Sequence, residues 1–225
     1  MAKINLDKYY TPSDLAEYCV KKTKEVIGKE NITEWLEPSA GDGVFLPYLD
    51  NNYLAFDIEP EDDNIEQKNY LELDLPYFKG RCVIGNPPFG RSNNLTVAFY
   101  KKAIQQADYI AFILPVSQYE NNIRLFDFDM IYSEKLNDLP YSGKVLKCCF
   151  NIYKRPNSGI NKKPDYRLND ITILEHHSTR NPIPFDYNTH DFRMCAWGAA
   201  MGSEVQENKY ALEYCIKVND KSKVN

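Results

Sequence analysis

The sequence predicts an α/β protein built on a doubly wound, mostly parallel sheet with an antiparallel hairpin at one edge. Segments of strand length alternate with segments whose apolar residues recur at helical spacing through the first half of the chain. One segment, 109–114, is apolar throughout, which is typical of a central strand covered on both faces. After Gly143 no helical pattern separates the next two strand-like segments, so we expect them to pair antiparallel.

The elements of the first half are predicted from local signals. A first helix is expected to begin at Pro12, whose missing N–H costs nothing at the first helical position, after Thr11 as the cap. Its apolar residues recur at helical spacing up to Gly28, which ends the helix. Strands and a second helix are then expected at 33–36, 53–57, near 65, at 81–85, at 94–107 (the helix) and at 109–114.

In the last third of the chain the recognisable patterns are those of strands. Segments 145–153 and 170–175, joined by a polar loop, are expected to form the edge hairpin, and further strand-like pieces lie at 192–196 and 210–218. We therefore assign residues 1–177 to a larger domain that carries the chemistry. Residues 178–225 form a small extension, which we interpret as a reduced substrate-recognition element.

Composition excludes several classes of protein. With 225 residues, 43% of them hydrophobic and 26% charged, the chain can fill a core, which excludes a disordered protein. No apolar run reaches the roughly 18 residues of a membrane span, and the N-terminus lacks the apolar stretch of a signal peptide, so a cytoplasmic protein is expected. Six cysteines without a CxxC pair, and only three histidines, predict no metal site.

A basic stretch contrasts with the net charge of −5. Residues 144–167 carry seven basic side chains against one acidic side chain. Such a stretch on an acidic chain is typical of a phosphate-binding surface, and the alternative is a solvated loop beside a strand. The candidate contacts with nucleic acid are Arg155, Lys162, Lys163 and Arg167.

Two features indicate a cofactor that contains a nucleoside. The first is the run Glu37-Pro38-Ser39-Ala40-Gly41-Asp42-Gly43 after a predicted strand, where two glycines one residue apart let the backbone approach a ligand closely. The second is Asp57 at the end of the next strand, where nucleotide-binding α/β folds place a carboxylate for ribose hydroxyls. The full dinucleotide motif would have a third glycine at position 46, which is Leu46.

The most informative motif is Asn86-Pro87-Pro88-Phe89, which directly follows strand 81–85. With this motif the sequence resembles the S-adenosylmethionine-dependent amino-methyltransferases, chiefly the DNA adenine-N6 type in which the cofactor motifs precede the catalytic one. The resemblance covers roughly residues 9–153. It implies a Rossmann-like methyltransferase fold and S-adenosylmethionine as the cofactor.

The resemblance also implies roles for the matching residues. The segment 10–12 would close over the methionine end of the cofactor, the glycine turn would form the cofactor loop, and Asp57 would hold the ribose. Asn69 stands where the family has an acidic residue against the cofactor's adenine, and its amide oxygen can still accept from an amino group. The candidate cofactor-binding residues are Tyr10, Thr11, Pro12, Glu37, Pro38, Ser39, Ala40, Gly41, Asp57, Ile58, Asn69, Tyr70 and Asn86.

The residue types of the proline turn suit chemistry on an amine. The exocyclic amine of adenine is a poor nucleophile because its lone pair is delocalised into the ring. The Asn86 side-chain oxygen and the Pro87 carbonyl can accept its two hydrogens and aim the lone pair at the methyl group, while Phe89 can stack on the base. A base in a duplex must flip out to reach such a site. The candidate catalytic residues are therefore Asn86, Pro87, Pro88 and Phe89.

The leading interpretation is an enzyme that methylates the N6 amine of adenine, with DNA as its partner. Adenine in RNA is the nearest alternative, because the same motif works on any unpaired base. A protein-glutamine methyltransferase also uses Asn-Pro-Pro-aromatic, and a non-catalytic binding module that kept the fold is an alternative from another class. A second copy of the chain or a separate recognition subunit would supply the recognition that a short extension lacks.

Overall fold

The computed structural model describes residues 10–136, 139–141, 144–164, 170–176, 189–198, 201–205 and 210–219. The chain divides into two compact units, Met1–Pro164 and Asp165–Asn225. The division lies ahead of strand β10 (Ile171–His176), which the sequence analysis placed in the larger domain.

The first unit is built on a seven-stranded sheet with the order β3-β2-β1-β4-β5-β9-β6. The strands are β1 (Glu34–Glu37), β2 (Tyr53–Asp57), β3 (Glu66–Gln67), β4 (Arg81–Gly85), β5 (Tyr109–Pro115), β6 (Asp129–Lys135) and β9 (Cys148–Lys154). Strands β1 to β5 pair parallel with one another, and β9 pairs antiparallel with β5 and β6. This confirms the predicted mostly parallel, doubly wound sheet with an antiparallel edge.

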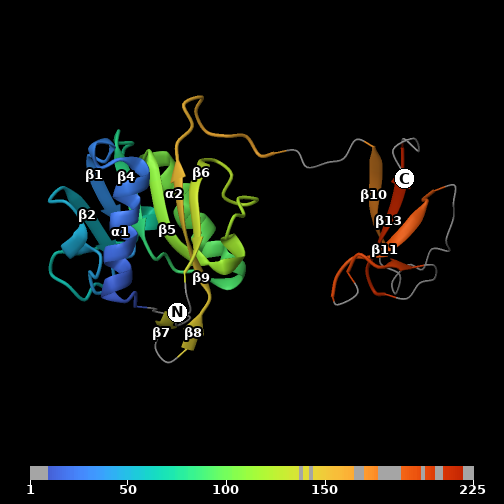
Figure 1. Ribbon diagram of the computed structural model, residues 1–225, viewed down its shortest axis with the longest axis horizontal. Coiled ribbons are helices and arrows are strands. Elements are labelled where there is room, and N and C mark those ends of the chain that lie inside the picture. The colour runs from blue at the N-terminus through green and yellow to red at the C-terminus, as the bar shows by residue number, and fades with distance from the viewer. Residues whose placement is uncertain are drawn as a thin grey trace. The chain divides into compact units, whose positions relative to one another are not determined.

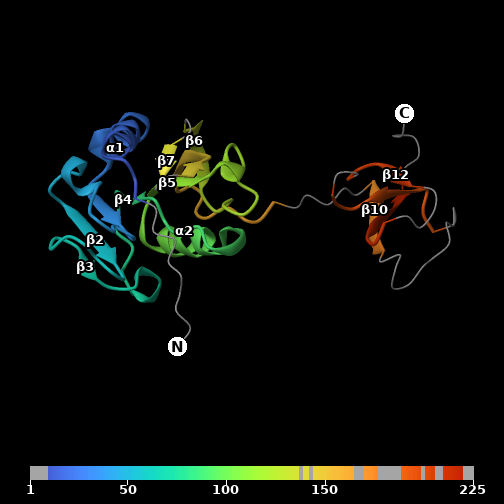
Figure 2. The same cartoon turned by 90° about the horizontal axis from the view of Figure 1, so that it is seen from below.

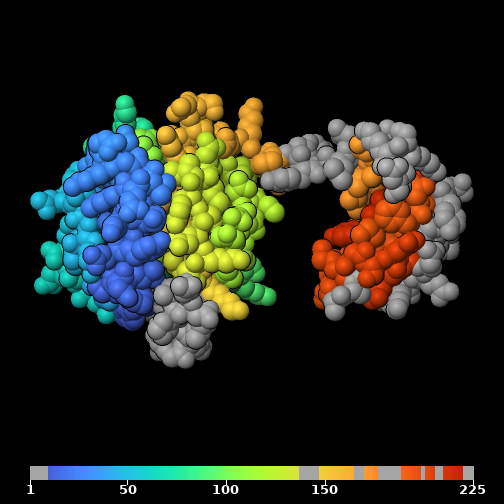
Figure 3. Space-filling model, viewed as in Figure 1, coloured from blue at the N-terminus to red at the C-terminus, as the bar shows by residue number. Residues whose placement is uncertain are grey.

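Two α-helices cover opposite faces of this sheet (Figure 2). Helix α1 (Ser13–Ile27) ends at Gly28, as predicted, and α2 (Asn94–Gln106) leads into β5. In β5, Ala111 and Ile113 belong to the core beneath α1, whereas Ile110 and Phe112 belong to the core beneath α2. Successive side chains of this buried strand point to opposite faces of the sheet, so the strand contributes to two separate cores. Figure 3 shows α1 in blue over one of these faces.

Short 3-10 helices take the place of longer helices in the remaining connections. They are η1 (Lys29–Asn31), η2 (Leu46–Tyr48), η3 (Tyr70–Glu72), η4 (Arg91–Asn93) and η5 (Val116–Gln118). None of the helices in the described ranges is long and apolar enough to cross a membrane.

The predicted edge hairpin was wrong in its pairing. The antiparallel partners of β9 are β5 and β6, whereas the segment predicted at 170–175 forms β10 in the second unit. Strand β6 was missed because a register shift between Met130 and Tyr132 interrupts its alternation, and because its side chains are mostly half-buried or exposed.

The chain enters strand β9 at one end of the sheet and leaves it at the opposite end (Figure 1). Pro115 pairs with Cys148, so the hairpin of β7 (Leu139–Tyr141) and β8 (Lys144–Leu146) leaves the sheet at the carboxyl end of β5. Tyr109 pairs with Lys154, so the loop after β9 leaves at the amino end of β5. The candidate catalytic residues follow β4 at the edge formed by the carboxyl ends of the parallel strands, and we call this edge the catalytic edge.

The second unit contains a four-stranded antiparallel sheet with the order β10-β13-β11-β12. The further strands are β11 (Phe192–Cys195), β12 (Glu204–Val205) and β13 (Glu213–Val218). Arg193 and Glu213 form an ion pair inside it, with 3.4 Å between Nη1 and Oε2. Trp197 is 64% exposed, so this large aromatic residue lies outside the small core.

Candidate active site

The predicted site residues emerge at one edge of the sheet because three of its strands are parallel neighbours. Strand β1 pairs with β2 on one side and with β4 on the other. Glu37, Asp57 and Asn86 stand at or directly after the carboxyl ends of these strands. In open α/β sheets, ligands bind outside the carboxyl ends of the strands. The catalytic edge is therefore the candidate site.

The glycine turn after β1 is held by Asp57. Gly41 has a φ of +54°, and its N–H donates to Asp57 Oδ2 over 2.8 Å. The N–H of Glu59 donates to Asp57 Oδ1 over the same distance. A Cβ on Gly41 would meet no atom within 4 Å. Asp57 thus shapes the turn in addition to its predicted role, and the space beside Gly41 is open for a ligand.

Glu37 is a buried carboxyl group that has no cationic partner among the residues the structure describes. Its side chain is 1% exposed, and Oε2 has no hydrogen-bond partner. The Ser39 hydroxyl nearby in sequence is also buried without a partner. Burial, and then the charges of Asp42 and Asp57, raise the pKa of Glu37 well above its ordinary value of 4.5. A positively charged group of a ligand would satisfy this carboxylate.

The proline turn presents its polar groups beside the start of α1. Asn86 Nδ2 donates to the hydroxyl of buried Thr11 over 3.3 Å. This leaves the Asn86 side-chain oxygen as the atom able to accept hydrogens from a substrate amine. Pro87 is buried, and Pro88 and Phe89 are half-buried, with Phe89 against the core beneath α1. The prediction that Thr11 caps the first helix was wrong: α1 begins at Ser13, its N-cap residue is Pro12, and no side chain caps it.

The segment before α1 spans the site. Tyr10 donates from its hydroxyl to Glu61 Oε1 over 2.6 Å, and Thr11 contacts Asn86. Pro12, which follows, is the N-cap residue of α1. The segment 10–12 therefore lies between the acidic loop after β2 and the proline turn.

Asn69 and Tyr70 form local and core contacts. The Asn69 side-chain oxygen accepts from the N–H of Leu71 over 3.2 Å, and its amide donates to Glu72 over 2.7 Å, which caps η3. Tyr70 is 1% exposed and donates from its hydroxyl to Gln106 over 2.9 Å. Both side chains have structural roles here, and their predicted contacts with a cofactor stay a prediction. Ile58, beside Asp57, is 41% exposed.

The basic loop, by which we mean residues 155–164 after β9, lies away from the catalytic edge. Arg155 donates to the carbonyls of Ile104 and Ala107, so its guanidinium holds the C-terminal end of α2. Its predicted contact with phosphate stays a prediction. Lys162 and Lys163 are exposed. The loop is fixed beside the start of β6, where Asn161 donates to Asp129 over 2.9 Å. Arg167 lies outside the described residues.

Two loops at the catalytic edge are joined by contacts that the sequence did not reveal. Arg124, after β5, donates to the carbonyl of Ser92, after β4, over 2.6 Å. Asn93 donates to the Ser117 hydroxyl over 3.3 Å. These pairs are separated by 32 and 24 residues, and no local pattern marks them. The loops therefore form one continuous wall beside the proline turn.

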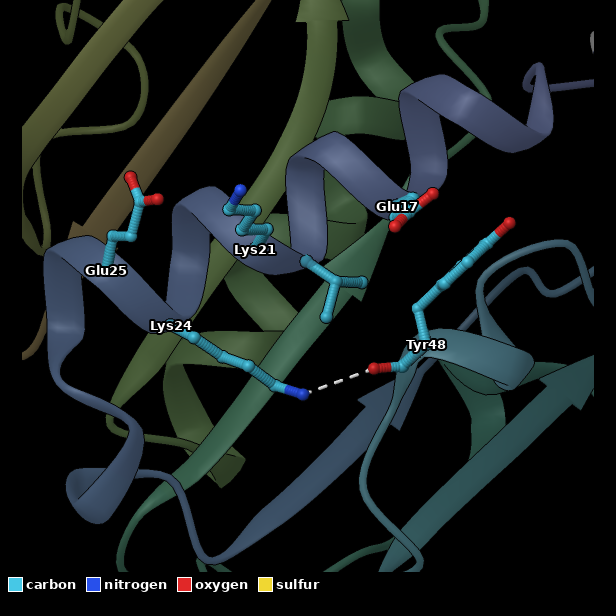
Figure 4. Close-up of a pocket in the computed structure, with 6 residues that line it drawn as sticks. Glu17, Lys21, Lys24, Glu25 and Tyr48 are labelled. Carbon is cyan, nitrogen blue, oxygen red and sulfur yellow. Dashed lines mark hydrogen bonds between the residues drawn. The ribbon is translucent and has the colours of Figure 1, made fainter.

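A separate hollow of about 460 Å³ lies between α1 and η2. Figure 4 shows Lys24 reaching across it to the carbonyl of Tyr48, over 3.2 Å. None of the predicted site residues lines this hollow, and we assign no ligand to it. In the described part of the chain, no group of three or more His, Cys, Asp or Glu side chains could hold a metal ion. All six cysteines are buried and unpaired.

Comparison with known proteins identifies the fold. No family model and no curated protein matches the sequence. A Listeria monocytogenes protein assigned to the class I S-adenosylmethionine-dependent methyltransferases aligns with a TM-score of 0.52 and 14% identity, over 75% of this chain and 66% of that protein. A Pyrococcus horikoshii protein assigned as an RNA methyltransferase aligns with a TM-score of 0.51 and 18% identity, over 68% and 88%.

A third structure connects the fold with restriction enzymes. The M protein of the type I restriction enzyme EcoKI aligns with a TM-score of 0.50 and 17% identity, over 71% of this chain and 47% of that protein. This chain thus spans about half of the EcoKI subunit and about two thirds of the Listeria protein. At these low sequence identities, the similarity to the three proteins is a similarity of fold. The chain has the Rossmann-like fold of the class I S-adenosylmethionine-dependent methyltransferases.

Proposed function

We propose that the protein transfers a methyl group from S-adenosylmethionine to the exocyclic N6 amine of adenine in DNA. The observation that carries this proposal is the placement of Asn86 and the glycine turn at one edge, after the neighbouring parallel strands β4 and β1. A methyl donor at the turn and an amine held by Asn86 would then be adjacent. Such positioning can supply most of the rate when the methyl group is already activated.

The residues at the glycine turn fit this cofactor. The buried Glu37 carboxyl, with one oxygen unpaired, suits a cationic ammonium group, and the open side of Gly41 admits a ligand close to the backbone. Asp57, at the end of β2, suits ribose hydroxyls. When bound, S-adenosylmethionine supplies an activated methyl group on its sulfonium. The residues of the chain bind and orient the cofactor and the substrate, and they exclude water from the site.

Asn86 and Pro87 would orient the substrate amine. The contact of Asn86 Nδ2 with Thr11 directs the side-chain oxygen away from Thr11, where it can accept one amine hydrogen. The Pro87 carbonyl would accept the other, and Phe89, half-exposed beside them, would stack on the base. Accepting both hydrogens turns the nitrogen lone pair toward the methyl group. No nucleophilic Cys or His is required for this step.

Adenine in RNA is the second candidate. The alignment with the Pyrococcus protein, assigned as an RNA methyltransferase, covers 88% of that protein, whereas the alignment with the EcoKI M protein covers 47%. We place DNA first because the motif order and the Asn-Pro-Pro-Phe turn resemble the DNA adenine-N6 family.

Calorimetric titration and nucleoside analysis test the proposal. We expect S-adenosylmethionine to bind, and incubation with DNA and with RNA, followed by mass spectrometry of the nucleosides, to reveal N6-methyladenine in DNA. Asn86→Ala should lose methylation and keep cofactor affinity within a few fold. The matched control is Asn157→Ala, an exposed asparagine in the loop after β9. An absence of cofactor binding would leave only the binding-module interpretation, and methylation by Asn86→Ala would refute the assigned mechanism.

A further inference from the structure

Charges of opposite sign occupy the two halves of the catalytic edge. The loop after β2 is acidic, since residues 57–66 contain six acidic side chains and no basic one. On the other half, exposed basic side chains lie in the loops after β4 and β5, at the last residue of β6 and directly before β9. These side chains, which we call the basic rim, are Arg91, Arg124, Lys135 and Lys147.

Arg91 and Arg124 lie on the wall beside the proline turn. Arg91 is the second residue after Phe89 and begins η4. Arg124 donates to the carbonyl of Ser92 over 2.6 Å and to the side chain of Asn94 over 3.0 Å. The guanidinium of Arg124 is therefore fixed over η4, next to Ser92, which directly follows Arg91.

Lys135 and Lys147 lie at the ends of the neighbouring strands. Lys135 pairs with Cys149 in the sheet, and the carbonyl of Lys147 accepts from the N–H of Val116, directly after β5, over 3.0 Å. The Lys135 ammonium lies 4.5 Å from the ring centre of Tyr119, in the loop after β5. Backbone pairing and this cation–π contact thus bring both lysines to the edge that carries Arg124.

The four charges of the basic rim are not neutralised within the described residues. None of them forms an ion pair there. By contrast, Lys24, Lys68 and Lys101 all pair with a carboxylate. A set of unpaired cations from four loops, beside a candidate base pocket, is suited to a polyanion.

We propose that the basic rim binds the phosphodiester backbone of the strand whose adenine enters the site. This inference rests on the proposed function, because it takes Asn86 and Phe89 as the position of the base. The phosphates that flank this base must lie near the proline turn, where Arg91 and Arg124 stand. The acidic loop after β2 repels the strand and directs it to the basic half of the edge. Lys162 and Lys163 lie at the other end of the sheet and take no part.

The salt dependence of binding tests this surface. Fluorescence anisotropy with adenine-containing DNA and RNA oligomers gives the slope of log K against log [salt] for each protein. The first variant is the double substitution Arg91→Gln with Lys147→Gln, since neither side chain makes a hydrogen bond or ion pair in the described structure. Losing two phosphate contacts should reduce the slope by about 1.5. Arg124→Gln with Lys135→Gln is the second variant, and Lys162→Gln with Lys163→Gln is the matched control.

The outcomes separate this inference from the proposed function. A reduced slope in the two rim variants, with an unchanged slope in the control, supports the basic rim. An unchanged slope in both rim variants, or an equal reduction in the control, overturns it, even when the wild type methylates adenine. If the slopes change as expected and the wild type methylates no nucleic acid, the surface stands and the proposed reaction fails. Comparison of the DNA and RNA arms shows which backbone binds more tightly.

Discussion

The amide nitrogen of Asn86 donates a hydrogen bond to the hydroxyl of Thr11, which lies 75 residues earlier in the chain. An asparagine side chain can turn over and exchange its oxygen and nitrogen, and only the oxygen can accept hydrogens from an amine. While the Thr11 hydroxyl accepts from the nitrogen, the oxygen keeps the productive orientation. Thr11 is buried at the start of α1, so this partner is fixed by the fold.

Removing the Thr11 hydroxyl should lower turnover. Thr11→Val keeps the shape of the side chain and loses the acceptor, so Asn86 would spend part of its time turned the wrong way. A lost neutral hydrogen bond of about 1 kcal/mol corresponds to roughly a fivefold fall in kcat. Thr11→Ser keeps the hydroxyl and should retain most of the activity. Equal activity of the valine and serine variants in single-turnover assays would show that Thr11 does not orient Asn86.

Substitution of Glu37 should stabilise the free protein and weaken cofactor binding. Its carboxyl is buried with one oxygen unpaired, and its pKa is raised well above 4.5 by burial and by the nearby acids. Since the raised pKa makes ionisation costly for the fold, Glu37→Gln should gain about 1 kcal/mol or more in free energy of unfolding at pH 8. At pH 4, where the wild-type carboxyl is mostly protonated in both the folded and the unfolded state, the gain should be small.

The same substitution removes the predicted partner of the cofactor's ammonium group. We expect the Kd for S-adenosylmethionine to rise roughly 10- to 100-fold. Thermal unfolding at the two pH values and calorimetric titration measure both effects. A variant that is less stable than the wild type at pH 8 would mean that Glu37 has a stabilising partner.

Cofactor binding should release a proton from Glu37. Because its pKa is raised in the free protein, the carboxyl holds its proton above pH 4.5, and a cation placed beside it lowers the pKa again. Calorimetric titrations at several pH values between about 5 and 7, in buffers of different ionisation enthalpy, should show release of up to about one proton per cofactor at a pH below the raised pKa. Glu37→Gln should abolish this dependence on the buffer. An enthalpy that is independent of the buffer in the wild type would contradict the assignment.

The sequence predicted the parts of the fold that local signals determine. Gly28 ends α1 because it takes a φ of +86°, and β5 is buried along its length because both faces are covered. The motif residues at 37, 57 and 86 could be placed at one edge because parallel strands bring their carboxyl ends together. Their contacts with one another, such as Asp57 to the N–H of Gly41, depend on packing that no local pattern records.

The errors arose where tertiary pairing decides the structure. Strand β6 lacks regular alternation because of its register shift, so the sequence gives little sign of it. Without β6, the next strand-like segment became the expected partner of β9. The direction of β9 puts Lys162, a predicted contact with nucleic acid, at the end of the sheet opposite Asn86. Strand direction, and not the density of charge along the chain, determines which basic residues lie near Asn86.

A methyl group added at Gly41 should interfere with cofactor binding, and Gly159 provides a matched comparison. Both glycines have positive φ, +54° and +97°, and a Cβ at either position would meet no atom within 4 Å. Each alanine substitution therefore carries a similar backbone strain of about 1 kcal/mol, without a clash in the protein itself. Only Gly41 lies at the turn between Glu37 and Asp57, whereas Gly159 lies in the loop after β9. We expect both variants to unfold at a slightly lower temperature. Only Gly41→Ala should raise the Kd for S-adenosylmethionine, by about tenfold or more, because its methyl group occupies the space that the ligand needs. If the two variants bind the cofactor equally well, the open side of Gly41 does not face it.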